Sequence, residues 1–379
     1  MLKHTKRFCD SFLARGVPGF DLAVYQRGEC LLRYANGYRD LERKLPMRGT
    51  ERYNIYSASK PITCTAALML LERGLFSLEE PLSAYLPEFE AMTVKAEGGA
   101  RPAARPILIK HLFEMTAGFS YRCQSPSLLR AVAETDGRAP TREAMRYLAC
   151  EPLLFEPGER WEYSLCHDVL AALIEVIAGE KFESYVKRTI FDPLGMHDST
   201  FMLPPEELDS IAEQYAFRDG RAVNVGKEIV TYKLGREYAS GGAGGISTVD
   251  DYIKFLEGLR TGALLSPEML TLMTTDRLTD SQKRTFWQRD RHGYGLGVRC
   301  SKGDPHHPDF GWGGAAGAFL AIDPEKELSL YFGMHMLSSP TQGIRSMLYR
   351  MIRAELYAPE ELIDIHGELS TLYHYTLTY

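Results

Sequence analysis

Ser57 and Lys60 are the residues of this sequence best placed to do chemistry together. They lie three positions apart, where a strand-like stretch at 53–56 turns into a long helix with an apolar run at 66–71. Three positions make almost one helical turn, so the Lys60 amine is expected beside the Ser57 hydroxyl. The unpaired amides and positive dipole at a helix N-terminus would also favour a developing oxyanion. The arrangement predicts a serine nucleophile with an adjacent base.

The same spacing occurs a second time, which shows that spacing alone is a weak signal. Ser184 and Lys187 match it inside an ordinary amphipathic helix, where such residues usually belong to a solvated face. The change from strand to helix is the context that distinguishes the two matches, and it favours Ser57.

The composition excludes several classes of function. The chain has 379 residues, enough for two or three structural units, and its formal net charge of -6 is spread along the sequence. We therefore expect no nucleic-acid partner and no membrane contact. The N-terminal residues lack the apolar segment of a signal peptide, and no stretch is long enough to span a bilayer. Seven cysteines without a C-x-x-C pair fit reduced thiols and offer no zinc spacing, so we expect a cytoplasmic protein.

Strand-like segments occur near both ends of the chain, with helical segments between them. The expected strands are 20–25 and 30–34, joined as a hairpin, and 294–300, 316–323 and 328–334. The expected helices are 3–15, one starting at Ser57, 168–178, one opening at Thr248 after the glycine-rich loop 240–245, and 341–357. This order predicts an α+β fold, with one antiparallel sheet built from both chain ends and flanked by helices. Residues 1–62 and 220–357 would form the sheet domain, 63–219 an inserted, mostly helical domain, and 358–379 a tail of unassigned role.

Three motifs in one order carry a resemblance to a known superfamily. They are Ser57-x-x-Lys60, Tyr163-Ser164-Leu165 and Trp312-Gly313-Gly314, with supporting strings at 109–118, 192–196, 244–248 and 293–297. Together they resemble the serine β-lactamase and penicillin-binding protein superfamily, in its class C branch, and are most similar to family VIII carboxylesterases. The resemblance covers roughly residues 5–357 and implies the β-lactamase and transpeptidase type of fold.

The resemblance implies a role for each matching residue. Ser57 would attack a carbonyl and form an acyl-enzyme, while Lys60 and Tyr163 carry protons; which of the two first takes the serine proton stays open. The backbone amides of Ser57 and Ala315 would hold the oxyanion. A plain strand bulge is the alternative interpretation of Gly313 and Gly314.

Two departures from the family pattern bear on the substrate. Trp312 stands where the family often has a lysine that helps to hold a substrate carboxylate, and Leu165 replaces an amide side chain. Losing a charge-assisted hydrogen bond costs about 1.5–3 kcal/mol, so both changes favour neutral or apolar acyl groups. Phe119 and Tyr121 are expected to add aromatic lining to the same cleft, together with Gly313 and Gly314.

The leading interpretation is a serine hydrolase that cleaves carboxylic esters, with a small-molecule ester or amide as partner. A β-lactamase or D-Ala-directed peptidase, an acyltransferase to an alcohol, and a catalytically silent binding module are the alternatives. No cofactor or metal is expected, since His306 and His307 lie in a polar loop without metal-ligand spacing. His167 and Asp168 are expected to flank a helix start rather than to form a triad, and the oligomeric state stays open.

Overall fold

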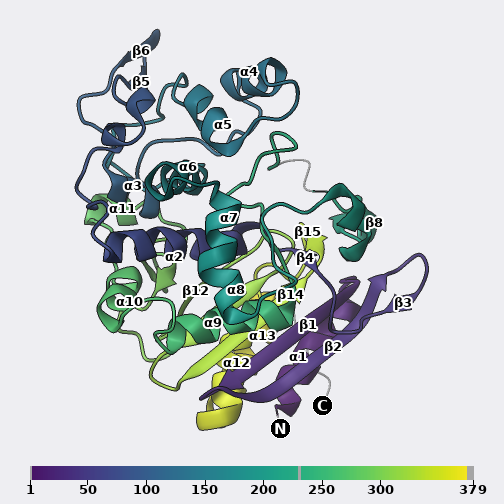
Figure 1. Ribbon diagram of the computed structural model, residues 1–379. Coiled ribbons are helices and arrows are strands. Elements are labelled where there is room, and N and C mark those ends of the chain that lie inside the picture. The colour runs from purple at the N-terminus through teal and green to yellow at the C-terminus, as the bar shows by residue number, and fades with distance from the viewer. Residues whose placement is uncertain (1, 229–231, 374–379) are drawn as a thin grey trace.

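An eight-stranded antiparallel sheet forms the centre of the molecule in the computed structural model, which describes residues 2–228 and 232–373 (Figure 1). The strand order is β10-β11-β12-β13-β14-β1-β2-β3. The bounds of these strands are Gly19–Gln26 for β1, Glu29–Asp40 for β2, Leu45–Pro46 for β3, Gly293–Tyr294 for β10, Arg299–Cys300 for β11, Phe310–Gly313 for β12, Phe319–Asp323 for β13 and Leu328–Met334 for β14.

The two ends of the chain meet in the middle of this sheet. β1 pairs antiparallel with β14, from Phe20 opposite Met334 to Gln26 opposite Leu328. Every residue of β14 is buried, and so are the first six of β1, as expected for strands covered on both faces. The α+β fold with a sheet built from both chain ends, predicted from the sequence, is confirmed.

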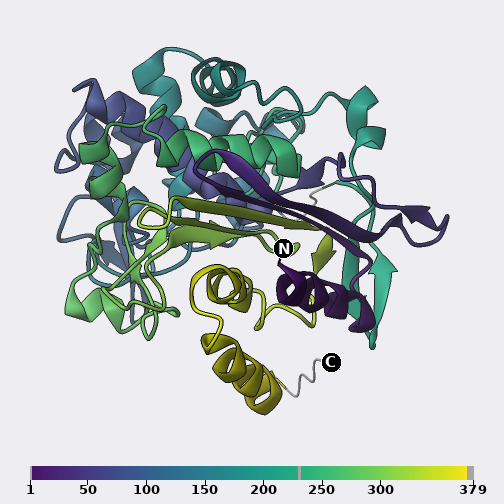
Figure 2. The same ribbon diagram turned by 90° about the horizontal axis from the view of Figure 1, so that it is seen from below.

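Helices cover the sheet on both faces. Figure 2 shows α1 (Lys3–Ala14), α12 (Met347–Tyr357) and α13 (Glu361–Tyr373) on one side and α9 (Val249–Arg260) on the other. One hydrophobic cluster joins α1, α12 and the adjoining sheet face, and a larger one joins the opposite face to the helical part of the chain. The sheet therefore separates two cores, and the larger core contains α2 (Ser59–Glu72).

The helical part packs around α2, which is buried along almost its whole length. α6 (Cys166–Ala178) lies against it and contacts α5 (Thr141–Leu148), which in turn contacts α4 (Pro126–Glu134). The remaining helices are α3 (Ile109–Phe113), α7 (Phe182–Val186) with a π-helical turn at Lys187–Phe191, α8 (Asp192–Leu194), α10 (Pro267–Thr274) and α11 (Asp280–Lys283), with 3-10 turns at Tyr56–Ala58, Leu82–Ala84, Pro87–Phe89 and Pro205–Ser210.

Three small sheets complete the fold. β4 (Tyr53–Asn54) pairs with β9 (Ile246–Ser247), and β5 (Thr93–Ala96) pairs with β6 (Gly99–Pro102). β7 (Tyr215–Arg218), β8 (Arg221–Asn224) and β15 (Met336–Leu337) form the third. This third sheet crosses the expected boundary between 219 and 220, and the domain boundaries stay a prediction.

Several expected elements differ from those observed; the strand expected at 316–323, for example, begins only at Phe319. The strand expected at 294–300 is split into β10 and β11 by a turn, in which the Gly295 amide donates to the Val298 carbonyl at 2.9 Å and Gly297 has a φ of +84. The helix expected at 341–357 begins at Met347 instead. The expected tail contains α13, which packs on α12, while residues 374–379 lie outside the described part of the chain.

Candidate active site

Ser57 lies in a 3-10 turn between β4 and α2, not within the helix itself. The preceding residue, Tyr56, has a φ of +49, a conformation that is costly for a bulky side chain. Its hydroxyl donates to Gln214 at 2.7 Å, and the Tyr252 hydroxyl of α9 donates to the Ala58 carbonyl at 2.6 Å. These contacts hold the sharp turn that presents the serine.

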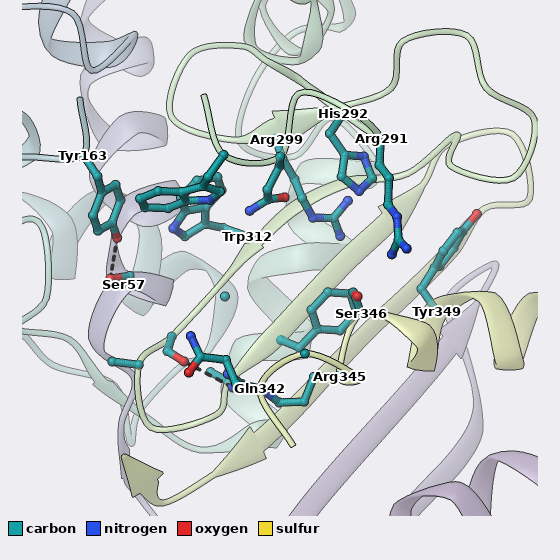
Figure 3. A pocket seen from close by; sticks show the side chains of 18 of the residues that line it. Ser57, Tyr163, Arg291, His292, Arg299, Trp312, Gln342, Arg345, Ser346 and Tyr349 are labelled. Carbon is teal, nitrogen blue, oxygen red and sulfur yellow. Dashed lines mark hydrogen bonds between the residues drawn. The ribbon is translucent and has the colours of Figure 1, made fainter. Parts of the chain in front are cut away.

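The side chains of Lys60 and Tyr163 meet at Ser57. The Tyr163 hydroxyl donates to the Ser57 Oγ at 2.6 Å (Figure 3), and the Lys60 Nζ donates to the same oxygen at 3.4 Å. Lys60 is fully buried, and its Nζ also donates to the Tyr121 hydroxyl at 3.2 Å and the Gly242 carbonyl at 2.7 Å. The structure therefore brings together the three residues that the sequence predicts as catalytic.

Aromatic rings fix this cluster. The Lys60 Nζ lies 4.4 Å from the centre of the Tyr163 ring, which stacks on Tyr121 with 5.2 Å between ring centres. Burial, reinforced by neighbouring phenols and carboxylate, raises the pKa of Tyr121 well above its ordinary value. Tyr121 therefore stays a neutral phenol that accepts a hydrogen bond from Lys60. From the sequence it was expected only to line the cleft.

The end of β12 lies against the nucleophile turn. A side chain at Gly314 would begin 2.3 Å from the Ile55 carbonyl oxygen, so only glycine permits this approach. The Gly314 amide donates to the Ala318 carbonyl at 2.8 Å, which folds the chain back after the strand. Ala315 follows, exposed in the lining of the pocket, and within the described residues its amide donates to no other group. Ala315 and Ser57 thus line the same pocket.

Ser57 opens into a pocket of about 910 Å³ that has two chemically different ends. The end near the serine is aromatic and is lined by Tyr121, Tyr163, Tyr232, Trp287 and Trp312. Trp287 is 53% exposed, and its ring centre lies 4.9 Å from that of Tyr163. An aromatic wall beside the serine suits an apolar substrate group.

The far end of the pocket is polar, as Figure 3 shows, with Arg291, His292 and Arg299 around it. Arg299 forms a buried ion pair with Asp309 at 2.6 Å. Burial lowers the pKa of His292 to about 2, so its imidazole is neutral. Burial also lowers the pKa of Arg345 to about 10; this guanidinium donates to the Gly314 carbonyl at 3.4 Å, and no described carboxylate pairs with it.

Two of the residues predicted to line the site, Phe119 and Leu165, lie elsewhere, whereas His167 is at a helix start, as expected. Phe119 and Leu165 are buried in the larger core and do not line the pocket; Phe119 packs edge-on against Phe89. His167 lies in the first turn of α6 with its ring 3.5 Å from the Cys64 sulfur, so it takes no part at Ser57. Trp312, Gly313 and Gly314 do line the pocket, as predicted.

The sequence interpretation missed the polar end of the pocket and Trp287. These residues come from segments 287–309 and 342–349, which carry no motif and meet only through the fold. Core residues of a helix or strand can be predicted from their regular spacing. Trp287 lies in a loop, which has no such spacing. Among the described residues there is neither a group of three potential metal ligands nor a helix long and apolar enough to cross a lipid bilayer.

The fold agrees with comparisons to known proteins. The chain belongs to the Beta-lactamase family, whose model matches residues 5–346. It is 29% identical to esterase EstB of Burkholderia gladioli, with 93% of each chain covered. It is 31% identical to monacolin J acid methylbutanoyltransferase of Aspergillus terreus, over 60% of this chain and 58% of that one.

Among solved structures, EstCE1, described as a hydrolase with promiscuous acyltransferase activity, superposes with a TM-score of 0.77. The two sequences are 26% identical, and the match covers 92% of this chain and 97% of the other. The predicted superfamily and the predicted class of enzyme, a serine hydrolase, are confirmed.

Proposed function

We propose that the protein hydrolyses carboxylic esters through an acyl-enzyme on Ser57, with Lys60 and Tyr163 as its proton carriers. The observation that carries this proposal is the contact of the Ser57 Oγ with both the Tyr163 phenol and the Lys60 amine, in the wall of the large pocket. The likeness to EstB along 93% of both chains supports an ester as the substrate.

The geometry suggests how the first half-reaction runs. The Ser57 Oγ attacks the carbonyl carbon while its proton passes to Tyr163, whose oxygen is the nearer acceptor once it is a phenolate. The Lys60 ammonium beside the ring stabilises that phenolate. The amides of Ser57 and Ala315 receive the negative charge of the tetrahedral oxygen. Collapse expels the alcohol, which takes the proton from Tyr163 and leaves the acyl group on Ser57.

The second half-reaction repeats these steps with water. Tyr163 removes a proton from water, the resulting hydroxide attacks the acyl carbon, and the tetrahedral intermediate releases the carboxylic acid as the Ser57 Oγ takes the proton back. An alcohol in place of water would give a new ester instead. The acyltransferase names of two similar proteins favour this second candidate function, which uses the same residues.

The two ends of the pocket suggest the shape of the substrate. The aromatic end accepts an apolar group next to the scissile bond, which agrees with the absence of a cation at position 312. Arg345 is buried without an acidic partner in the described part of the chain, so a carboxylate or another strong acceptor on the substrate would satisfy it. We therefore propose an ester with an apolar group beside its carbonyl and a strong hydrogen-bond acceptor that reaches Arg345 next to Gly314.

The experiment is a rate comparison across p-nitrophenyl esters of increasing acyl length, with nitrocefin as the β-lactam. Faster turnover of one or more esters than of nitrocefin is expected, and the reverse would favour a β-lactamase.

Intact-protein mass after treatment with a fluorophosphonate tests the nucleophile. Wild type should gain one adduct and Ser57→Ala none; no adduct on wild type would favour a silent binding module. Product that appears only after addition of an alcohol would identify an acyltransferase.

The proposal includes a reducing, cytoplasmic setting and a small-molecule partner. All seven cysteines are free thiols, and five of them are buried, which agrees with that setting. Burial raises the pKa of Cys64 and Cys166, so these two stay protonated and inert inside the core.

A further inference from the structure

Asp168 is a fully buried carboxylic acid that the catalytic scheme above does not use. It is the third residue of α6, and its Oδ1 accepts hydrogen bonds from the Tyr238 hydroxyl at 2.8 Å and the Ser240 hydroxyl at 2.6 Å. Its Oδ2 has no hydrogen-bond partner among the described residues. A buried carboxylate with only one of its two oxygens hydrogen-bonded costs free energy, so a compensating interaction is expected nearby.

Gly242 lies between this carboxylate and Lys60. The point at which a Gly242 side chain would begin is 2.6 Å from the Asp168 Oδ2 and 3.4 Å from the Lys60 Nζ. The two charged groups are therefore within the roughly 6 Å over which opposite charges stabilise each other. The Gly242 carbonyl also accepts the shortest hydrogen bond of Lys60, at 2.7 Å. One glycine thus links the amine to the acid.

Asp168 is the group that can balance the charge of Lys60. All three hydrogen-bond partners of Lys60 are neutral oxygens in the resting site. The other titratable groups around it, apart from Tyr163, are kept neutral by burial, which raises the pKa of the phenols and thiols and lowers that of the imidazole; they are Tyr121, Tyr238, Cys64, Cys123, Cys166 and His167. A buried ammonium without an anion nearby would be expensive.

Two opposing effects act on the charge of Asp168. Burial raises its pKa above the ordinary value, while the Ser240 and Tyr238 hydroxyls and the Lys60 charge limit that rise. The same hydroxyl of Ser240 accepts from the Ala243 amide at 3.0 Å, and Thr63 of α2 donates to the Gly241 carbonyl at 2.7 Å. The glycine-rich loop is thereby fastened to α6 on one side and to α2 on the other.

We propose that Asp168 is a positioning residue of the active site: its negative charge balances the Lys60 amine across Gly242, and its hydrogen bonds hold the loop 238–244 against α2. This inference rests on the proposed function, because its consequence is felt through the proton carriers at Ser57. A negative charge raises the pH at which neighbouring groups lose their protons. Removing it should therefore move both limbs of the pH profile of Ser57 reactivity to lower pH.

The test is the second-order rate of labelling by a fluorophosphonate, measured between about pH 5 and 10. The reagent forms a bond between phosphorus and the Ser57 Oγ and releases fluoride, so it reports the serine without depending on substrate preference. For Asp168→Asn we expect both limbs to move down by on the order of one pH unit. An amide oxygen can still accept from Tyr238 and Ser240, so a residue that only fastens the loop would leave the limbs in place.

Asp251→Asn is the matched control. Asp251 is also the third residue of a helix, α9, is buried, and accepts a hydrogen bond from a serine hydroxyl, Ser199. It lies outside the Ser57 pocket, so its variant should keep the wild-type profile. Superimposed profiles of wild type and Asp168→Asn would overturn the inference, whereas an unlabelled wild type would overturn the proposed function instead.

If Asp168→Asn does not fold, a second variant tests whether Asp168 balances the charge of Lys60. Tyr238→Phe removes one donor to the carboxylate and leaves the charge itself in place. The acid then gains its proton more easily, so a smaller shift of the acidic limb is expected. An unchanged limb in folded Tyr238→Phe would then count against Asp168 as the balancing charge.

Discussion

The two Ser-x-x-Lys segments of this chain have the same spacing but opposite surroundings. At Ser57 the lysine is fully buried and its amine reaches the serine, a phenol and a carbonyl. At Ser184, in α7, the Lys187 side chain is 65% exposed and pairs with Asp192 across the π-helical turn. The spacing brings an amine near a hydroxyl in both segments. Only the buried amine, which has no water to bind, forms a hydrogen bond with the hydroxyl.

The difference shows where reactivity comes from in this fold. An exposed lysine is solvated and its charge is screened, so it does little to a neighbouring serine. Lys60 has lost its water and is surrounded by groups from three other parts of the chain, which contribute Tyr121, Tyr163 and Gly242. The chemistry that we propose at Ser57 would thus be a property of the assembled core, and paired substitutions in the two segments can test this.

The largest contrast is expected from the serines themselves. Ser57→Ala removes the nucleophile, so ester hydrolysis should fall by about 10⁴-fold or more, toward the uncatalysed rate. Ser184→Ala should stay within about twofold of wild type, since exposed sites away from special features tolerate change. Initial rates with the best p-nitrophenyl ester measure both. Comparable losses in the two variants would show that the site is not at Ser57.

The lysines should give the next largest contrast. Lys60→Met keeps the length of the side chain but removes the amine, so kcat/KM should fall by about 10²–10⁴-fold, the usual range for a positioned proton carrier. Lys187→Met loses an exposed ion pair and should change the rate very little. Both variants should be assayed from pH 6 to 10. A fully active Lys60→Met would leave Tyr163 as the sole proton carrier.

Runs of apolar residues and the order of the motifs were enough to predict the fold and the meeting of Ser57, Lys60 and Tyr163. The alternating and continuous apolar runs gave β1, β2 and β14, and the motif order placed Ser57, Lys60 and Tyr163. What the sequence could not predict depends on which distant side chains meet. Phe119 looked like cleft lining but faces the core, because adjacent residues of an irregular segment can point to opposite sides. Asp168 looked like a helix-start residue, and only its neighbours from 238–242 reveal a further role.

A smaller contrast separates two glycines. In Gly242→Ala the new methyl group would lie 2.6 Å from the Asp168 carboxylate, so the loop must move away from Lys60. We expect the free energy of unfolding to fall by about 1–3 kcal/mol and kcat to fall by about tenfold or more. Gly367→Ala in α13 is the control, because a methyl group there meets nothing within 4 Å and alanine favours a helix. Urea unfolding and ester turnover are measured on both; an unperturbed Gly242→Ala would mean that this loop does not hold Lys60.

The smallest effect is expected at the rim of the pocket, where exposure weakens what a side chain can contribute. Trp287 is 53% exposed yet lies 4.9 Å from the Tyr163 ring, centre to centre, so a bound acyl or alkoxy group would cover it. In Trp287→Ala we expect KM for longer p-nitrophenyl esters to rise by about three- to tenfold, which corresponds to roughly 1 kcal/mol of lost apolar contact. Labelling by a small fluorophosphonate should hardly change.

Leu75→Ala serves as the comparison for Trp287, since Leu75 is a 40% exposed apolar side chain that does not line the pocket. A rise of KM that grows with acyl length in Trp287→Ala, and is missing in Leu75→Ala, would assign the tryptophan to substrate binding. Equal loss for short and long esters would instead mean that Trp287 supports the Tyr163 ring. In that case the exposed Trp287 would affect catalysis itself, as the buried residues around Ser57 do. The distinction between a buried reactive centre and an exposed binding wall would then no longer hold.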